Sequence, residues 1–387
     1  MSEIKKYYDV VICGAGPAGS ICAIALGKSG LNVLLIDKST FPREKICGGA
    51  LNPVVLKILN TVDPNLKEDL LQFNKKTFFN KTRFAYQNTK LFDYTFPNDT
   101  PGFICTRVDF DNFLFQHAKA LSNITTLENN ALSNIEVRNE KVILKTSTGL
   151  EIEARLAIGC DGAHSVVNKK LTQTKVDLNH YAGAVRAYYK NVKAVPQDCF
   201  EIHFVKGCPA GYFWIFPLQD NMYNVGFGVL SKYISENKIS LRQFLLDITQ
   251  SEEYKERFKD AELIGEIQGF GLPFGSRKVT ISGDHFMLCG DAASLVEPMW
   301  GEGISPALVS GRYAAWQAIE CFKENNFSSA FMKKYDDVVY KKLWKDNYRS
   351  YLARIVSIKL FWAFSFMARC KNFMRKLRNN KQKVSAS

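Results

Sequence analysis

The sequence predicts an α/β protein with a parallel-sheet domain, an inserted antiparallel sheet and a C-terminal helical tail. Three observations support this fold class. The chain opens with the pattern of a strand, a glycine turn, a helix and a second strand. Its middle contains aromatic-rich segments in which apolar and polar residues alternate. Another strand followed by a glycine turn lies near residue 300. The length of 387 residues suits one large domain or two ordinary ones.

The opening unit carries the pattern of a dinucleotide-binding turn. Val10–Cys13 is a continuous apolar run, as expected of a strand buried on both faces. The next six residues have the spacing G-x-G-x-x-G, in which Gly14 permits a tight turn, Gly16 lets the backbone approach a pyrophosphate and Gly19 lets the helix pack close to the strand. The free N–H groups at the start of that helix favour phosphate.

The second strand of this unit ends in an acidic residue. Val33–Ile36 is apolar, and Asp37 follows it, where a carboxylate accepts hydrogen bonds from the ribose hydroxyls of an adenosine. Because strand, helix, strand and acid occur in order, the signal is stronger than a lone glycine motif. The unit predicts a Rossmann-like dinucleotide site, but it does not by itself separate FAD from NAD.

A second half-site near residue 300 favours FAD. His285–Cys289 has the pattern of a strand, and it leads into Gly290-Asp291-Ala-Ala. Asp291 at this strand end suits a ribitol hydroxyl, and Gly301–Gly303 precede a small-residue helix that runs to about Cys321. A helix N-terminus stabilises the negative charge of a reduced flavin ring by up to ~1–2 kcal/mol. NAD needs no distant second half-site, whereas FAD does.

The middle of the chain predicts antiparallel strands. Residues 77–96 suggest two or three of them, and residues 182–229 suggest a second sheet. Strand alternation places Tyr212, Trp214 and Phe216 on one face. Such a stripe is either ordinary core or the wall of a site for a flat or greasy substrate.

Other candidate residues lie in the connecting segments. Cys47 precedes Gly48 in a loop that could cover a flavin ring, although a small buried cysteine beside a turn is an equal alternative. Arg107 precedes a helix, where it either binds flavin or phosphate oxygens or forms an ordinary salt bridge. Asp161 ends another buried strand, at the sheet edge where ligands bind.

Composition bounds the remaining functions. The five histidines show no metal-ligand spacing and the ten cysteines form no C-x-x-C pair, so we expect no metal and a reduced, cytoplasmic compartment. Met1–Tyr7 is polar, which argues against a signal peptide. Because every 18-residue apolar stretch contains charge, no membrane-spanning helix is expected.

The net charge of +13 is concentrated in the C-terminal tail. The residues after Asp346 include no Asp or Glu but ten Lys and Arg, and Ile355–Met367 is apolar apart from Lys359. One interpretation is a helix packed on the body with a solvated end. The other is a peripheral contact with an anionic membrane at its inner face. Nucleic-acid binding is disfavoured because the charge lies in a tail without a base-stacking arrangement.

Taken together, these motifs resemble the p-hydroxybenzoate hydroxylase-like flavoproteins and, within them, the geranylgeranyl reductase family. The resemblance covers about Tyr8 to Ala315. The superfamily motifs are Gly14-Ala-Gly-Pro-Ala-Gly19, Cys160-Asp161-Gly162-Ala-His-Ser165, and Gly290-Asp291-Ala-Ala with Pro298 and Gly301-Glu-Gly-Ile304. The narrower motifs are Lys45-Ile-Cys47-Gly48-Gly49 and Tyr212-Phe-Trp214-Ile-Phe216-Pro217 with Gly226-Phe-Gly228.

The resemblance implies an FAD enzyme in which a substrate cavity faces the flavin. Together with the turn glycines, the expected cofactor contacts are Gly14, Gly16, Ala18, Gly19, Asp37, Lys38, Cys47, Gly48, Arg107, Ala131, Asp161, Asp291, Gly303 and Ile304. The expected substrate contacts are Tyr212, Trp214, Phe216 and Pro217. No acidic group is obvious among the aromatic residues, so the candidate catalytic proton donor is Cys47 or water. We expect an FAD-binding domain of residues 1–64, 106–175 and 276–345, a substrate domain of 65–105 and 176–275, and a basic helical tail of 346–387.

The implied activity is reduction of C=C bonds in a prenyl lipid or quinone side chain, with NAD(P)H or a reduced carrier protein as electron donor. Hydroxylases of the superfamily carry an Arg where this chain has Val166-Val-Asn168 before Lys169, which argues against direct use of NADPH. One alternative is a monooxygenase or halogenase, although Tyr212 and Phe216 depart from the halogenase pattern W-x-W-x-I-P. Another is a membrane-surface flavoprotein that does not turn over prenyl lipids.

Overall fold

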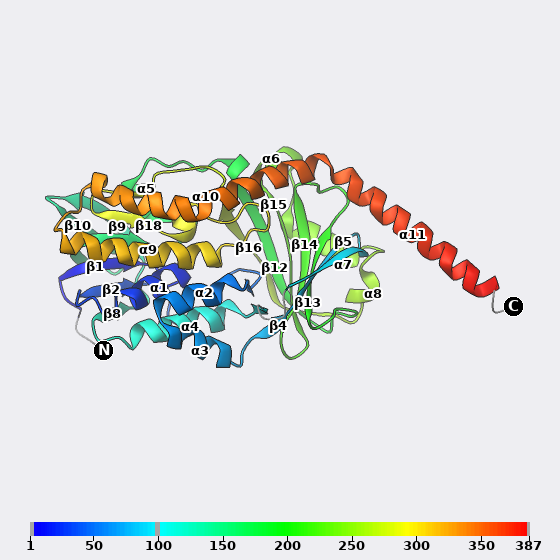
Figure 1. Ribbon diagram of the computed structural model, residues 1–387, viewed down its shortest axis with the longest axis horizontal. Coiled ribbons are helices and arrows are strands. Elements are labelled where there is room, and N and C mark those ends of the chain that lie inside the picture. The colour runs from blue at the N-terminus through cyan, green and yellow to red at the C-terminus, as the bar shows by residue number, and fades with distance from the viewer. Residues whose placement is uncertain (1–3, 97–100, 385–387) are drawn as a thin grey trace.

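The computed structural model describes residues 4–96 and 101–384, with side chains described as far as Met374. A mainly parallel sheet with its helices forms one end of the body, and an antiparallel sheet forms the other (Figure 1). Helix α10 (Ser329–Lys359) runs along both ends, and helix α11 (Phe361–Val384) follows it after a bend and projects from the body (Figure 1). The predicted α/β class, inserted antiparallel sheet and helical tail are confirmed.

The first sheet has eight strands, six of which follow the order β17-β18-β11-β1-β2-β8. Its central pairs are parallel: β1 lies between β11 and β2, β2 pairs with β8, and β11 pairs with β18. The β9–β10 hairpin joins through β10, which runs antiparallel to β11. The strands are β1 (Tyr7–Cys13), β2 (Val33–Ile36), β8 (Ile124–Leu127), β9 (Leu132–Arg138), β10 (Lys141–Thr146), β11 (Glu151–Gly159), β17 (Ser282–Gly283) and β18 (Phe286–Leu288).

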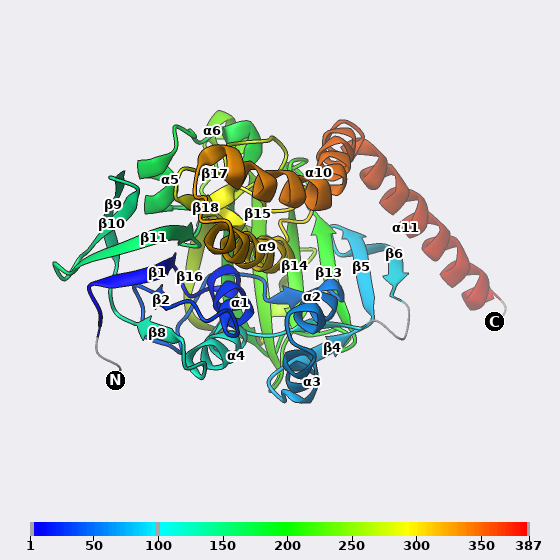
Figure 2. The ribbon, with the colours of Figure 1, turned by 60° about the vertical axis from the view of Figure 1, so that its left-hand side comes forward.

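The helices that start the two predicted half-sites pack directly against each other. Helix α1 (Pro17–Leu26) follows the first glycine turn, and helix α9 (Ile304–Lys323) follows the second. A methyl group at Gly311 of α9 would lie 2.2 Å from the carbonyl oxygen of Ala18, so the two backbones are in close contact. Both N-termini therefore open toward one region at the edge of the sheet. Figure 2 shows α1 and α9 near the centre of the body.

The remaining helices of this end complete the layer. They are α2 (Val54–Val62), α3 (Pro64–Gln72), α4 (Arg107–Lys119) and α5 (Val166–Leu171), with a short 3-10 turn at Gly290–Ala293. Leu66 and Leu70 of α3 are buried in a cluster with residues of α2, α4 and α9. Helix α3, which falls in the range expected for the substrate domain, thus packs on the nucleotide-binding end. The expected boundary at residue 346 falls inside α10, which is continuous.

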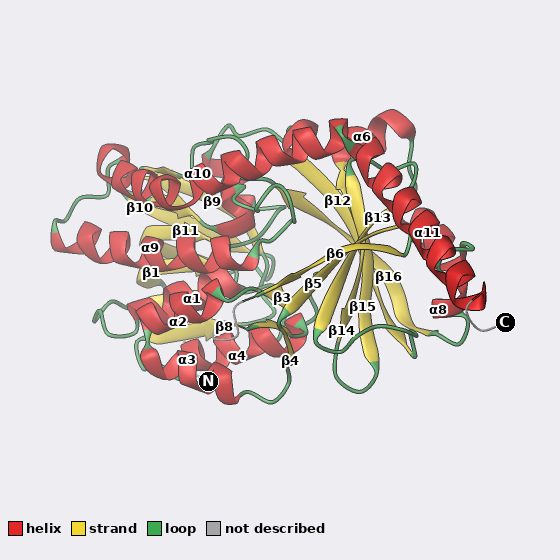
Figure 3. Cartoon of the chain, turned by 45° about the vertical axis from the view of Figure 1, so that its right-hand side comes forward, coloured by secondary structure: helices red, strands yellow, loops and turns green. Residues whose placement is uncertain are grey.

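The second sheet has seven strands in the order β16-β12-β15-β14-β13-β5-β6. Figure 3 shows it at the opposite end of the body from the first sheet. Apolar side chains on one of its faces pack against α6 (Ser231–Asn237), α7 (Leu241–Gln250) and α8 (Lys255–Phe258). The strands are β5 (Lys81–Tyr86), β6 (Thr89–Thr95), β12 (Tyr181–Lys190), β13 (Cys199–Phe204), β14 (Gly211–Pro217), β15 (Met222–Leu230) and β16 (Glu262–Pro273).

Residues 77–96 form three strands, each with an antiparallel neighbour as expected, but they belong to two different sheets. Strands β5 and β6 are antiparallel to each other, and β5 also runs parallel to β13, a pairing that needs the long connection between these two strands. Strand β4 (Thr77–Phe79) belongs to a separate three-stranded sheet with β3 (Ala50–Leu51) and β7 (Gly102–Ile104). This small sheet connects the loop after Cys47 to the substrate end of the molecule.

Candidate functional site

The first glycine turn has the shape expected of a phosphate cradle. Gly14 has a φ of +100°, and a methyl group there would lie 2.4 Å from the carbonyl oxygen of Cys160. A methyl group at Gly19 would lie 1.8 Å from the carbonyl oxygen of Gly14, so this residue lets α1 approach β1. Gly16 is the N-cap of α1 and has no side chain to bond the first helical N–H groups. Those donors are therefore available to an anion.

Two arginines lie beside this turn and share one buried carboxylate. Arg43 approaches Gly16, and its Nη1 is 2.9 Å from Oδ2 of Asp111. Arg107 binds the same carboxylate through Nε (2.5 Å) and Nη2 (2.7 Å). Two cations held by one fully buried anion leave a net positive charge next to the helix N-terminus. Arg107 was predicted, whereas Arg43 and Asp111 were missed, although the i, i+4 spacing of Arg107 and Asp111 is visible in the sequence.

Asp37, the acidic residue after β2, stabilises the first glycine turn through a hydrogen bond. Asp37 is buried and accepts hydrogen bonds from the backbone N–H of Ala15 (2.8 Å) and of Ser39 (2.9 Å). It also borders the cavity, beside the exposed Lys38. Asp37 thus holds the glycine turn in place while one side of it remains open to a ligand.

Asp161 has a clear structural role at the edge of the same cavity. Its carboxylate accepts hydrogen bonds from the hydroxyl of Ser165 (2.5 Å), the N-cap residue of helix α5, and from the N–H of Val166 (2.7 Å), the first residue of that helix. Burial raises the pKa of Asp161, and these hydrogen bonds oppose the rise. The residue borders the cavity as expected, but its oxygens are engaged within the chain.

The second half-site contains a carboxylate that faces the cavity. Burial raises the pKa of Asp291, and Lys45 and Arg107 oppose the rise. A methyl group at Gly303 would lie 3.4 Å from Oδ1 of Asp291, which places this carboxylate beside the start of α9. Among the described residues, no side-chain or backbone donor forms a hydrogen bond to its oxygens, so they are free to accept hydroxyl groups of a ligand.

Lys45 is a second charged group in this part of the cavity. Its Nζ lies 2.9 Å from the centre of the Phe270 ring, and burial lowers its pKa to about 8 despite the nearby Asp291. In the sequence, Lys45 is recognisable only as part of the Lys45–Gly49 motif. A lone lysine in a loop gives no sign of burial, and the loop reaches Phe270 of β16 only in the folded chain.

The turn before α9 carries a further unusual carboxylic acid. Oε1 of Glu302 accepts a hydrogen bond from the N–H of Ser305 (2.7 Å), and burial raises the pKa of Glu302 to about 7. Glu302 borders the cavity together with Gly303 and Ile304. A carboxylic acid with this pKa exchanges protons near neutral pH.

The aromatic stripe of β14 forms one wall of the cavity. Tyr212, Trp214 and Phe216 line it, while the alternate residues Phe213 and Ile215 are fully buried on the opposite face. Pro217 does not line the cavity, because strand alternation places it on the side of Phe213, so its prediction as a substrate contact is not supported by its position. The hydroxyl of Tyr212 donates to the carbonyl oxygen of Trp300.

Gly226 provides the space that the Trp214 side chain of the aromatic wall occupies. It lies directly opposite Trp214 on the neighbouring strand β15, and a methyl group there would lie 2.1 Å from the indole ring. The indole therefore lies across the backbone of Gly226, where any side chain would displace it. Its Nε1–H donates to Oδ1 of Asn224 (3.0 Å), and the amide of Asn224 donates to the carbonyl oxygen of Cys47 (2.8 Å). Asn224, missed from the sequence, thus joins the aromatic wall to the Cys47 loop.

Cys47 lies where the two parts of the site meet. Its thiol is half-buried, and the N–H of Gly49 lies 3.4 Å from the sulfur. The cationic Arg107 lies near the same thiol. The adjacent Gly48 faces the wall, since a methyl group there would lie 3.0 Å from the Phe216 ring. Cys47 is therefore close both to the cation pair and to the aromatic wall.

One continuous cavity of about 640 Å³ contains nearly all of the predicted site. It is bordered by every predicted cofactor residue except Gly19, which is a packing residue, and by the three aromatic residues of β14. Apolar side chains from several strands complete the substrate end, including Val185, Ile202, Phe204, Phe270 and Leu272. The structure thus brings together segments that lie up to about 345 residues apart in the sequence, from Cys13 to Ile358.

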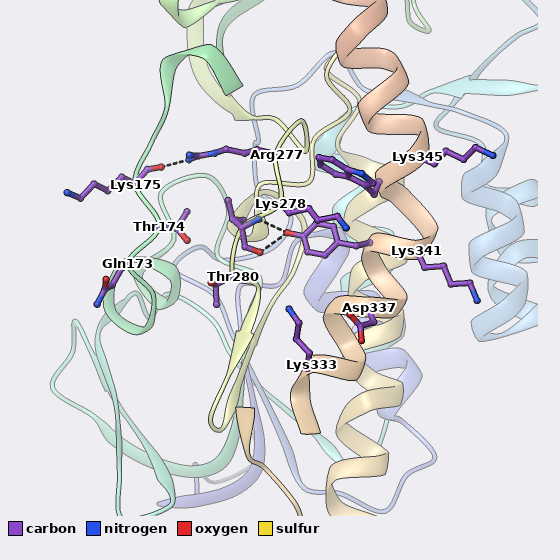
Figure 4. A pocket seen from close by; sticks show the side chains of 13 residues that line it. Gln173, Thr174, Lys175, Arg277, Lys278, Thr280, Lys333, Asp337, Lys341 and Lys345 are labelled. Carbon is purple, nitrogen blue, oxygen red and sulfur yellow. Dashed lines mark hydrogen bonds between the residues drawn. The ribbon is translucent and has the colours of Figure 1, made fainter. Parts of the chain in front are cut away.

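A second hollow lies elsewhere, between α10 and the loops around residues 174 and 278 (Figure 4). Its lining is strongly basic, with the single acid Asp337 among the six cations Lys175, Arg277, Lys278, Lys333, Lys341 and Lys345. Lys278 lies over the rings of Tyr340 and Trp344. Because it shares no lining residue with the cavity of the predicted site, this basic groove is separate from that site.

The residues present fit FAD. The glycine cradle and the cation pair Arg43 and Arg107 suit its pyrophosphate, and the open carboxylate of Asp291 suits ribitol hydroxyls. When bound there, FAD supplies hydride and electron transfer at its ring. The fold and the site together define an FAD-dependent oxidoreductase.

Comparison with known proteins agrees with this class. The model of a family described as "FAD binding domain" matches residues 7–338, and the chain belongs to that family. A digeranylgeranylglycerophospholipid reductase of Thermoplasma acidophilum is 28% identical over 359 residues, covering 90% of this chain and 87% of the relative. A menaquinone reductase of Mycobacterium tuberculosis is 30% identical over 314 residues, covering 79% and 75%.

Solved structures share the fold. A geranylgeranyl bacteriochlorophyll reductase-like protein from Thermoplasma acidophilum superposes with a TM-score of 0.82 at 24% identity, covering 94% of this chain and 90% of that one. A halogenase in complex with FAD superposes with a TM-score of 0.76 at 17% identity, covering 98% and 85%. At these identities the likeness concerns the fold alone.

Proposed function

We propose that this protein uses reduced FAD to reduce carbon–carbon double bonds in the prenyl chain of a lipid or quinone. The observation that carries the proposal is the continuity of one cavity from the FAD half-sites to an aromatic and aliphatic wall. Such a wall binds a hydrocarbon chain by burying its surface, which contributes about 25 cal/mol per Å² of apolar area. The names of the relatives from Thermoplasma acidophilum and Mycobacterium tuberculosis support the same substrate class.

The chain's own residues have defined tasks in this proposal. The wall of Tyr212, Trp214 and Phe216 holds the alkene against the Cys47 loop and excludes water. Reduction delivers a hydride to one alkene carbon and a proton to the other. Cys47 is the proposed proton donor, because its loop contacts the wall and Arg107 lies beside its thiol. Glu302, whose pKa is raised to about 7 by burial, can restore that proton near neutral pH.

The electron donor is proposed to be NAD(P)H or a reduced carrier protein. Where related hydroxylases carry an Arg, this chain has Val166-Val-Asn168, and the side chain of Val167 is fully buried. The amide of Asn168 is also occupied, since it donates to the carbonyl oxygen of Ala292 (2.7 Å). Neither residue offers a cation to the phosphate of NADPH, which favours a carrier protein.

The test is product analysis under anaerobic conditions. The FAD-loaded protein, reduced chemically, is incubated with a geranylgeranylated lipid and with a menaquinone, and the products are analysed by mass spectrometry. We expect the mass to rise by two hydrogen atoms for each bond reduced. The Cys47→Ala variant should retain its FAD spectrum and lose most of this turnover. Unchanged lipid masses would reject the reductase, and an oxygen-dependent hydroxylated or halogenated product would assign the alternative chemistry.

A further inference from the structure

Helix α11 presents an apolar face that nothing in the described part of the chain covers. Its opposite face packs on the body: Phe364 stacks on Phe204 with ring centres 4.3 Å apart, and Ala368 is buried. The outward face is apolar over its described length, and its large side chains are strongly exposed: Trp362 (65%), Phe366 (59%), Met367 (40%), Phe373 (63%) and Met374 (58%). At 100° per residue these side chains share one broad side of the helix.

A second row of exposed apolar side chains precedes the bend. Tyr348, Leu352, Val356 and Leu360 are each 44–52% exposed and follow one another at intervals of four residues, so they lie along one face of α10. Soluble proteins rarely leave such long apolar rows exposed without a partner. Among the described residues no single helix is long and apolar enough to cross a bilayer, although α10 and Phe361–Met374, bent by 62°, meet that criterion as a pair.

The charge of this region indicates the chemistry of the partner. The residues after Asp346 include ten Lys and Arg and no acid, so the whole segment attracts an anionic surface. Arg369 is exposed on the flank of the apolar face. An amphipathic helix with Trp and Phe on one side and Lys and Arg around it is suited to the interface of an anionic bilayer, because the rings enter the headgroup region and the cations meet phosphates.

The same segment borders the substrate cavity. Arg354, Ser357 and Ile358 of α10 line the cavity, and Phe204, which also lines it, is the residue on which Phe364 of α11 stacks. The guanidinium of Arg354 is held between the carbonyl oxygens of Pro298 (3.3 Å) and Asn179 (3.2 Å), so this part of α10 is fixed to the body. The bend between α10 and α11 therefore joins the exposed apolar rows to the cavity wall.

We propose that the outward faces of α10 and α11 dock on an anionic membrane surface, and that the cavity takes its apolar substrate from that membrane beside the bend at Leu360. The docking stands on the exposed faces and the charge alone, whereas the delivery of a prenyl substrate rests on the proposed function. An acyl or prenyl chain that leaves the bilayer at this point meets Ile358 and Phe204 without crossing water.

The first experiment measures binding of the FAD-loaded, full-length protein to sedimented vesicles. We expect binding to vesicles containing phosphatidylglycerol, weaker binding to pure phosphatidylcholine, and at least a tenfold loss in the Phe366→Ser/Phe373→Ser variant. Phe78→Ser is the matched control, because Phe78 is also half exposed (50%) but lies in the small sheet. Lys28→Glu/Lys57→Glu, which reverses two exposed lysines outside α10 and α11, controls for total charge. Both controls should bind as the unchanged protein does.

A second measurement locates the helix relative to the lipid. Brominated lipids should quench tryptophan fluorescence of the unchanged protein, and the Trp362→Phe variant should lose most of this quenching while it still binds. Equal binding of the Phe366→Ser/Phe373→Ser variant and the unchanged protein would overturn the docking proposal. The docking proposal would also be overturned if the unchanged protein formed a dimer without lipid and the Phe366→Ser/Phe373→Ser variant did not, since a second copy of the chain would then cover this face.

The outcome is separable from that of the proposed function. Vesicle binding without any prenyl turnover would leave the docking site standing and reject the reductase. The second case concerns the Phe366→Ser/Phe373→Ser variant. If this variant reduced a vesicle-embedded prenyl substrate as well as a short, soluble one, delivery from the membrane would be rejected and the reductase would stand. The proposal predicts that this variant loses at least tenfold in turnover of the vesicle-embedded substrate and keeps its turnover of the soluble one.

Discussion

A substitution at Gly226 tests whether the aromatic wall holds the Cys47 loop. Alanine at this position would place a methyl carbon 2.1 Å from the Trp214 ring, which must then move. Overpacking of this kind costs about 1–3 kcal/mol. Displacing the indole also breaks its hydrogen bond to Asn224 (3.0 Å), which is worth about 1 kcal/mol, and it leaves the bond from Asn224 to Cys47 (2.8 Å) less well held. We therefore expect a total loss of about 2–4 kcal/mol in unfolding free energy.

The neighbouring glycine provides a matched control. A methyl group at Gly228, two residues along the same strand, would lie 3.5 Å from the side chain of Ala184, an ordinary contact. Urea unfolding of the FAD-loaded protein should show a lower midpoint for Gly226→Ala at unchanged slope, and a shift below about 0.5 kcal/mol for Gly228→Ala. The Gly226→Ala variant should also bind FAD more weakly, because the loop that carries Cys47 loses its anchor.

A double variant tests whether the indole is the cause. Phenylalanine lacks the outer ring that lies nearest to Gly226, so Trp214→Phe should recover part of the loss in the Gly226→Ala background although it is destabilising alone. The two substitutions should therefore show a favourable coupling of about 0.5–3 kcal/mol. Equal stabilities of Gly226→Ala and Gly228→Ala, or purely additive effects with Trp214→Phe, would refute the reasoning.

Three further predictions concern the cofactor site. Arg43→Ala should weaken FAD binding about 10–100-fold in an equilibrium titration, since a charge-assisted hydrogen bond contributes about 1.5–3 kcal/mol, whereas Lys28→Ala, at an exposed position outside the cavity lining, should change it little. Because burial raises the pKa of Glu302 from 4.5 to about 7, the unfolding free energy should fall by up to about 3 kcal/mol as pH rises from about 4.5 to 7. The Glu302→Gln variant should show a weaker dependence of unfolding free energy on pH over this range, and an identical dependence would contradict the role of Glu302. Free FAD at 100 times its Kd should stabilise the apoprotein by about 2.7 kcal/mol in thermal or urea unfolding, and an unchanged transition would mean that the cradle does not bind it.

The fold and the halves of the site follow from local patterns in the sequence. The strand ending at Cys13, the spacing of Gly14, Gly16 and Gly19, and the alternation of Tyr212, Trp214 and Phe216 each depend on neighbours within one or two elements. The structure shows them where the patterns predict. Pro217 was assigned to the cavity as part of a motif, although the same alternation places it on the other face.

The missed residues depend on contacts between distant segments. Arg43 gains its role from Asp111, and Asn224 gains its role from Trp214 and Cys47, so no local pattern marks either residue. The raised pKa of Glu302 and the lowered pKa of Lys45 arise from burial, which only the folded chain defines. Strand β5 forms the expected antiparallel pair with β6, but its parallel pairing with β13 was not predicted, because it joins segments more than a hundred residues apart.

The most direct test of this account is a single-turnover experiment on the flavin itself. The FAD-loaded protein is reduced without oxygen and mixed rapidly with a geranylgeranylated lipid while the absorbance of oxidised flavin is recorded. We predict that the yellow band returns at a rate that rises with lipid concentration, and that Cys47→Ala slows this return. Flavin that stays reduced with every prenyl lipid, and regains colour only when oxygen is admitted, would contradict the account.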